Sequence, residues 1–113
     1  MKIFNLTTDA SFTDKPNIVS MGETDFSKEI RICMGKNALM KEHQAPGAIT
    51  IELFSGEIEL STPEETHIMS PGEIAVFAAK APHSLLAKED SLIRLSLSKK
   101  DSIQRVQNLI INS

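Results

Sequence analysis

The residues of this sequence that are best suited to chemistry are its three histidines, His43, His67 and His83. Imidazole nitrogens bind divalent metals and exchange protons near neutral pH. A catalytic metal centre normally uses three protein ligands and leaves one position open. The chain has no glycine-rich phosphate loop, no serine nucleophile elbow and no paired-carboxylate signature. The histidines are therefore the first candidates for a site, either as metal ligands or as polar groups of a pocket.

The composition indicates one cytoplasmic domain, residues 1–113, without a membrane span. Cys33 is the only cysteine, so no internal disulfide can form, and we expect it to be a small buried residue rather than a nucleophile. The N-terminus lacks the features of a signal peptide, and no apolar run approaches the ~20 residues of a membrane helix. The net charge of −3 and the absence of Trp and Tyr argue against binding to nucleic acid.

Short runs of alternating apolar and polar residues, separated by Gly, Pro and Asn turns, predict an all-β sandwich or barrel. Ile49, Ile51 and Leu53 share one face of their run, which marks that face as buried. Ser55 and Gly56 stand between two such runs and predict a tight hairpin. The predicted strands are residues 29–34, 49–54, 57–61, 74–79 and 92–97, with a further one ending in His67-Ile68-Met69.

The C-terminal residues 101–111 follow a different pattern, because their apolar residues recur at helical spacing. Asp101 with Gln104 is similar to a capping box. We expect a short amphipathic helix here, which packs either on the barrel or on a partner chain. Its apolar positions are Ile103, Val106, Leu109 and Ile110.

The order of these elements resembles a small single-domain cupin. The segments NALMKEHQAPGAITIELFSG and GEIAVFAAKAPHSLLA lie over the two sequence blocks of that family, and the likeness covers about residues 26–97. It implies an antiparallel jelly-roll β-barrel. It also implies a homodimer formed through edge strands, with the N-terminal segment KIFNL as the candidate for a strand added to the partner's sheet.

The sequence resembles the two blocks in its turns and strands, but it has only two of the four metal ligands. His43 and His83 match family histidines, whereas Ala45 and Ile49 stand where a second histidine and a glutamate would be. The glycine positions are Asn37, Gly56, Gly72 and Lys80, and Asn is tolerable at the first because it also visits positive φ. Two ligands make a weak metal site. His43 and His83 are therefore expected to be polar pocket residues, with Zn, Ni, Mn or Fe bound at most at low occupancy.

The function expected from these residues is a small-ligand-binding barrel that is non-catalytic or binds metal weakly, with no resident cofactor. The expected ligand has an apolar body and one hydrogen-bonding group. The alternative is a metal-dependent dioxygenase or isomerase that uses His43, His83 and a non-standard third ligand, for which His67 is the best candidate. A purely structural or protein-binding module is the third possibility. The expected pocket residues are His43, His83, His67, Met40, Ile51, Met69 and Leu85.

Overall fold

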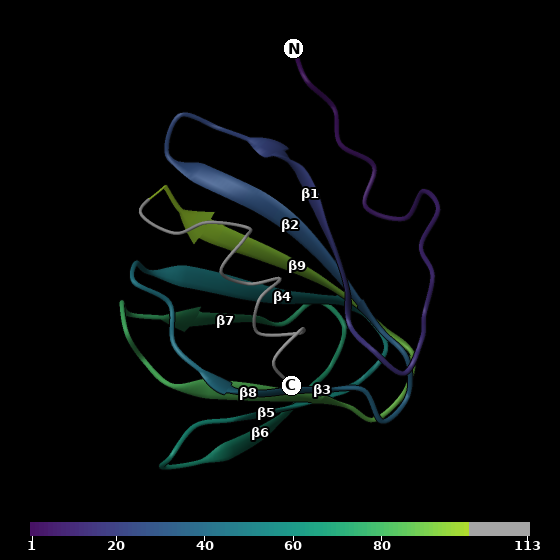
Figure 1. Cartoon of the computed structure of the whole chain (residues 1–113), viewed down its shortest axis with the longest axis vertical. Helices are drawn as coiled ribbons and strands as arrows, with labels where there is room; N and C mark the ends of the chain where they lie inside the picture. Colours follow the sequence, from purple (N-terminus) through teal and green to yellow (C-terminus); the bar gives the residue numbers. More distant parts are fainter. Residues whose placement is uncertain (100–113) are drawn as a thin grey trace.

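The computed structural model describes residues 1–99 as two antiparallel β-sheets that face each other (Figure 1). One sheet has the order β1-β2-β9-β4-β7 and the other the order β3-β8-β5-β6. No helix in this part of the chain is long and apolar enough to cross a membrane. The predicted helix 101–111 lies outside the described residues. The strands are β1 (Asn17–Glu23), β2 (Ser27–Met34), β3 (Leu39–His43), β4 (Ile49–Ser55), β5 (Ile58–Ser61), β6 (Thr66–Met69), β7 (Ile74–Phe77), β8 (His83–Ala87) and β9 (Ser91–Ser98).

The hydrophobic core fills the space between the two sheets, as the alternating pattern predicts. On β4, Ile49, Ile51 and Leu53 point inward and are 4%, 2% and 0% exposed. They lie opposite Leu97, Leu95 and Ile93 of β9 in the strand register, and those three side chains are also buried. Each fully buried Leu or Ile stabilises the fold by roughly 1.5–3 kcal/mol, so the matched faces of β4 and β9 are a major source of stability.

The predicted hairpin at Ser55-Gly56 is wrong. β4 pairs with β7 and β9, whereas β5 pairs with β6 and β8, so the turn carries the chain from one sheet to the other. Alternation identifies which side chains face inward, but it does not identify which strand is the hydrogen-bonding partner. Gly56 does adopt the expected positive φ, at 97°. A Cβ at this position would overlap the carbonyl oxygen of Asp90 and Oγ of Ser91, so the turn also needs glycine for space.

The N-terminal segment runs beside the five-stranded sheet on the side of β1 (Figure 1), and its backbone meets the outer face of β2 at Arg31. Nη1 of Arg31 donates hydrogen bonds to the carbonyl oxygens of Leu6 and Thr8. Cys33, which shares that outer face, is 0% exposed, and its predicted burial is confirmed. Residues 1–16 form no strand in this structure, and the segment KIFNL lies against its own chain.

The turn positions of the two cupin-like blocks keep a left-handed backbone even where glycine has been replaced. Asn37 has a φ of 74° and Lys80 a φ of 66°. Asn visits this region readily, but Lys does so at a steric cost of roughly 1 kcal/mol. The N–H of Lys80 donates a hydrogen bond of 2.7 Å to the carbonyl oxygen of Ala45, which ties the turn before β8 to the segment after β3. These two turn positions thus have the left-handed backbone that glycine favours, although their side chains are Asn and Lys.

Candidate functional site

His43 and His83 lie side by side inside the molecule because β3 and β8 pair with these two residues in register. Their ring centroids are 4.4 Å apart, and the rings meet edge to face at 66°. His83 is 2% exposed, whereas His43 is half-buried at the end of β3. The resemblance implied that these two residues could converge, and the strand register brings them together.

Both imidazole rings are oriented in the same way by the backbone. Nδ1 of His43 lies 2.6 Å from the carbonyl oxygen of Lys41, and Nδ1 of His83 lies 2.9 Å from that of Ala81. A carbonyl oxygen only accepts hydrogen bonds, so Nδ1 is the donor in each ring and carries the proton of the neutral form. In the neutral form of each ring, Nε2 is therefore the acceptor nitrogen.

The residues around this pair do not fit a catalytic metal centre. The two positions where the cupin pattern has further ligands hold Ala45 and Ile49, which are apolar and 3% and 4% exposed. Among residues 1–99, no group of three or more His, Cys, Asp or Glu side chains is placed to hold a metal ion. Two imidazoles fall one short of the three protein ligands that such a centre normally uses.

The space beside the two histidines is almost completely filled by side chains. The cavity has a volume of about 10 Å³, which is roughly the room that one water molecule needs. Phe77 stacks on His83, with ring centroids 4.7 Å apart and an interplanar angle of 26°. Of the expected pocket residues, Met40, Ile51 and Leu85 line this small cavity with His43 and His83.

His67 and Met69 lie in a different place, a cleft of about 420 Å³ between β6 and β7. These two strands are the edges of the two sheets, and the sandwich is open where they face each other. Leu60, Met69 and Phe77 form the apolar side of the cleft. Phe77 therefore separates the cleft from the histidine pair, since it lines the first and stacks on a member of the second.

The imidazole of His67 is paired with a carboxylate and is not directed at the other two histidines. Its Nε2 lies 3.2 Å from Oε1 of Glu73, which also accepts a 2.8 Å hydrogen bond from the N–H of Ser70. The Ser70 N–H and then the His67 ring hold the pKa of Glu73 below its ordinary value of 4.5. Glu73 is thus a carboxylate at neutral pH, held in a fixed orientation at the rim of the cleft.

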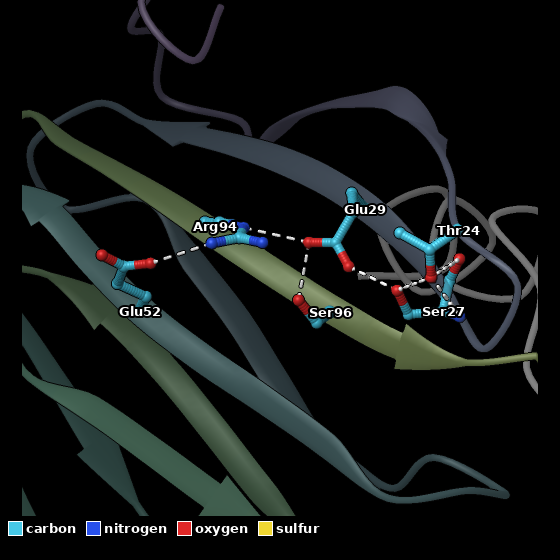
Figure 2. Close-up of polar contacts among 6 residues, drawn as sticks. All are labelled: Thr24, Ser27, Glu29, Glu52, Arg94 and Ser96. Atoms are coloured by element: carbon cyan, nitrogen blue, oxygen red, sulfur yellow. Dashed lines mark hydrogen bonds and ion pairs between the residues drawn. The ribbon is translucent and has the colours of Figure 1, made fainter. Parts of the chain in front are cut away.

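A polar network on the outer face of the five-stranded sheet was not anticipated from the sequence. Oε1 of Glu29 accepts hydrogen bonds of 2.9 Å from Nε of Arg94 and 2.7 Å from Oγ of Ser96, and Oε2 accepts one of 2.7 Å from Ser27 (Figure 2). Nη1 of Arg94 lies 3.6 Å from Oε1 of Glu52 on β4. The side chain of Glu29 is only 8% exposed, so the network holds a largely buried carboxylate on the outside of the barrel.

The sequence feature that points to this network is the position of its charged residues within their strands. Glu29, Glu52 and Arg94 all occupy positions whose side chains alternate away from the core. Their proximity depends on the strand order β2-β9-β4, which joins segments far apart in the sequence. Alternation predicts that each of the three faces outward, but it does not predict that they meet.

Comparison with known proteins supports the fold and does not identify a function. No protein-family model matches the sequence, and no curated protein matches it significantly. An RmlC-like cupin from Desulfovibrio desulfuricans is similar in structure, with a TM-score of 0.78 at 20% identity over 87% of this chain and 96% of that one. A conserved Streptococcus pyogenes protein of unknown function has a TM-score of 0.75 at 22% identity, with 89% and 90% of the two chains covered.

The likeness extends over almost the whole length of a third structure. An RmlC-like cupin from Shewanella frigidimarina has a TM-score of 0.75 at 10% identity, and the match covers 94% of this chain and 96% of that one. At these identities the likeness shows the fold alone. The chain is a small cupin-fold domain built from antiparallel sheets, as the two sequence blocks predicted.

Proposed function

We propose that this protein is a non-catalytic cupin-fold domain that binds a small ligand in the cleft between β6 and β7. The proposal rests on the difference in volume between the two cavities. The cleft offers about 420 Å³, within the usual size of small-molecule sites, whereas the cavity at His43 and His83 offers about 10 Å³. A ligand therefore fits between the edge strands, with its apolar body against Leu60, Met69 and Phe77.

The histidine pair has a secondary part in this proposal. His43 and His83 stand behind Phe77 as polar groups of a filled interior, and they bind a divalent metal such as Zn, Ni, Mn or Fe only weakly. The support is the count of ligands, since Ala45 and Ile49 occupy the other two positions of the cupin pattern. The enzyme alternative needs His67 as a third ligand, and His67 is paired with Glu73 in the cleft.

The ligand proposal is tested by titrating ¹⁵N-labelled protein with a library of small fragments. The expected result is a set of saturable amide shifts on β6 and β7. Ala75→Leu, which fills the cleft, should abolish these shifts, and Ile68→Ala, which truncates an exposed side chain outside the cleft lining, should retain them. Shifts that instead centre on His43 and His83, or no saturable shifts at all, would overturn the proposal.

A homodimer formed through edge strands is also part of this proposal. Its support is the edge strand β7, where Ile74 and Val76 are 58% and 75% exposed on the outer face of the five-stranded sheet. Exposed apolar side chains at a sheet edge are a common contact surface between copies. Sedimentation should give a dimer for the native chain and a monomer for Val76→Asp, with Ile68→Asp on β6 as a control that stays dimeric. A monomeric native chain would contradict this part.

The expected cytoplasmic location has one line of support, the single buried thiol of Cys33. A chain that forms no internal disulfide has no need of an oxidising compartment to fold. Fractionation of cells that express the full chain from its own gene, followed by immunodetection, tests this location. Recovery of the protein outside the cytoplasmic fraction would refute it.

A further inference from the structure

The polar lining of the β6–β7 cleft carries more information about the ligand than its size does. Four side chains supply this lining: Thr62, Glu65, His67 and Glu73. Two of them are carboxylic acids, and none of the cleft-lining residues is a lysine or an arginine. The cleft therefore has an acidic rim beside an apolar wall.

The charge of the rim is negative whichever form His67 takes. Glu73 is ionised at neutral pH, since the Ser70 N–H and His67 both bond to its Oε1 and lower its pKa. Glu65 adds a second carboxylate. A neutral His67 leaves the rim with two negative charges, and a protonated His67 leaves it with one. An anionic ligand is repelled from such a rim, and a cationic one is attracted.

The rim is better suited to an organic cation than to a metal ion. Among residues 1–99, no three His, Cys, Asp or Glu side chains are placed to hold a metal ion together, so Glu65, His67 and Glu73 do not form a cation cage. The apolar part of the lining is built from Leu60, Met69 and Phe77, which offer apolar contact and an aromatic ring but no metal ligand of the usual kind. A molecule that contacts both the acidic rim and the apolar residues of the cleft needs a hydrophobic part and a positively charged part.

We propose that the cleft selects small amines, with the ammonium group at Glu73 and the apolar body against Leu60, Met69 and Phe77. This inference rests on the proposed ligand-binding function and specifies the class of ligand. The two hydrogen bonds to Oε1 of Glu73 fix its carboxylate before a ligand arrives, so little side-chain freedom is lost on binding. Glu65 lies on the same cleft and adds to the negative potential.

The test uses three probes that share one body and differ only in the polar group: phenethylamine, 2-phenylethanol and 3-phenylpropionate. Binding is followed by the amide shifts of β6 and β7 in ¹⁵N-labelled full-length protein. Because an ion pair at an exposed carboxylate is weak, the amine should bind only roughly three- to fivefold more tightly than the alcohol. The carboxylate should bind more weakly than the alcohol.

Two matched variants separate the rim carboxylate from general surface charge. Glu73→Gln should remove most of the difference in affinity between the amine and the alcohol, with Glu65 accounting for what is left. Glu64→Gln removes an exposed carboxylate that does not line the cleft, and it should leave the preference unchanged. The melting temperature of each variant confirms that it is folded.

The remaining outcomes show whether the preference for amines fails alone or whether small-ligand binding in the cleft fails with it. Equal binding of the three probes, or a preference for the carboxylate, would overturn the selection of amines and leave small-ligand binding intact. An amine preference that is undiminished in Glu73→Gln would overturn the assigned role of Glu73. Failure of all three probes to shift any cleft amide at millimolar concentration would overturn both the amine inference and the cleft as the binding site.

Discussion

Phe77 lies stacked on His83, with ring centroids 4.7 Å apart, and so separates the open cleft from the histidine pair. One aromatic side chain at the end of β7 thereby divides the interior into a space that a ligand can enter and a space that is filled. The open cleft lies at the side of the sandwich, between the edge strands β6 and β7.

The first prediction concerns the separation of the cleft from the histidine pair by Phe77. Phe77→Ala should join the cleft to the space beside His83 and make the imidazole reactive towards diethylpyrocarbonate, because the Phe77 ring stacks on the His83 ring and also lines the cleft. The variant should also lose about 2 kcal/mol of stability, less than the 3–5 kcal/mol typical of a fully buried Phe because Phe77 is partly exposed. Mass spectrometry of the modified peptide measures the reactivity.

The control for this prediction is Phe26→Ala, since Phe26 is 78% exposed and lies between β1 and β2. It should leave both His83 reactivity and stability nearly unchanged. Equal reactivity of His83 in the native protein and in Phe77→Ala would show that Phe77 does not shield it.

The second prediction is a pH dependence of stability that originates at Glu29. Burial raises the pKa of this carboxyl, but the hydrogen bonds from Ser96, Ser27 and Arg94 outweigh burial and leave the pKa below 4.5. A carboxyl with a lowered folded pKa stabilises the fold above its unfolded pKa, and this contribution is lost as the pH falls through the folded pKa. Glu29→Gln should therefore be about 1–2 kcal/mol less stable than the native protein at pH 7.

Urea denaturation at several pH values measures this effect. The stability difference between the native protein and Glu29→Gln should shrink below about pH 4.5 and be close to zero near pH 2. Glu64→Gln serves as the control, because Glu64 is exposed and outside the network. A difference that stays constant from pH 7 to pH 3 would show that the charge of Glu29 is not what stabilises the fold.

The third prediction separates steric overlap from backbone strain at two turns. Gly56 and Gly72 have nearly equal φ values, 97° and 94°. A Cβ at Gly56 would overlap Asp90 and Ser91, whereas a Cβ at Gly72 has no heavy atom of a described residue within 4 Å. Gly72→Ala should therefore cost only the strain, about 1–2 kcal/mol, and Gly56→Ala should cost at least about 1 kcal/mol more. Thermal unfolding of the two variants gives the comparison, and equal losses would contradict it.

The fourth prediction concerns metal at the histidine pair. Protein purified without an affinity tag should contain much less than one Zn, Ni, Mn or Fe per chain. Added Zn²⁺ should raise the melting temperature by less than about 4 °C, since two ligands bind weakly and stabilisation follows the occupancy of the native state. The variant His43→Ala/His83→Ala should lose this small rise. Stoichiometric metal that disappears in the double variant would instead support a metal-dependent protein.

The fifth prediction is a stabilising substitution. Lys80→Gly should raise the stability by about 0.5–1 kcal/mol, because glycine adopts the φ of 66° without the steric cost that lysine carries. The hydrogen bond from the N–H of residue 80 to the carbonyl of Ala45 is retained. Lys41→Gly, within strand β3, is the matched control and should destabilise. A loss of stability in Lys80→Gly would show that the lysine side chain itself contributes.

Much of the fold could be predicted from the sequence, because a strand with one buried face alternates apolar and polar residues. This rule identified β2, β4, β5 and β9 and the inward face of Ile49, Ile51 and Leu53. It failed at Ser55-Gly56, since two consecutive alternating runs can belong to one sheet or to two. It also left β1, β3 and β8 unassigned, and only the family resemblance implied structure around His43 and His83.

The candidate site could be predicted only in part, because its geometry depends on contacts between distant segments. The resemblance implied that His43 and His83 could converge, and the structure places them together. The sequence did not indicate that Phe77 fills the space beside them, nor that His67 pairs with Glu73 in a separate cleft. Side-chain filling of a barrel is decided by packing between both sheets, and no local pattern encodes it.

Because Cys33 is buried, its reaction with a thiol reagent can report how often the protein opens around it. This sulfur atom is the only thiol in the chain, and it lies on β2 between β1 and β9 with 0% exposure. A thiol reagent can reach it only when the structure opens locally around β2, so the labelling rate at high reagent concentration equals the rate of that opening. The lifetime of the closed state around β2 can thus be measured in the unmodified protein, without an engineered label.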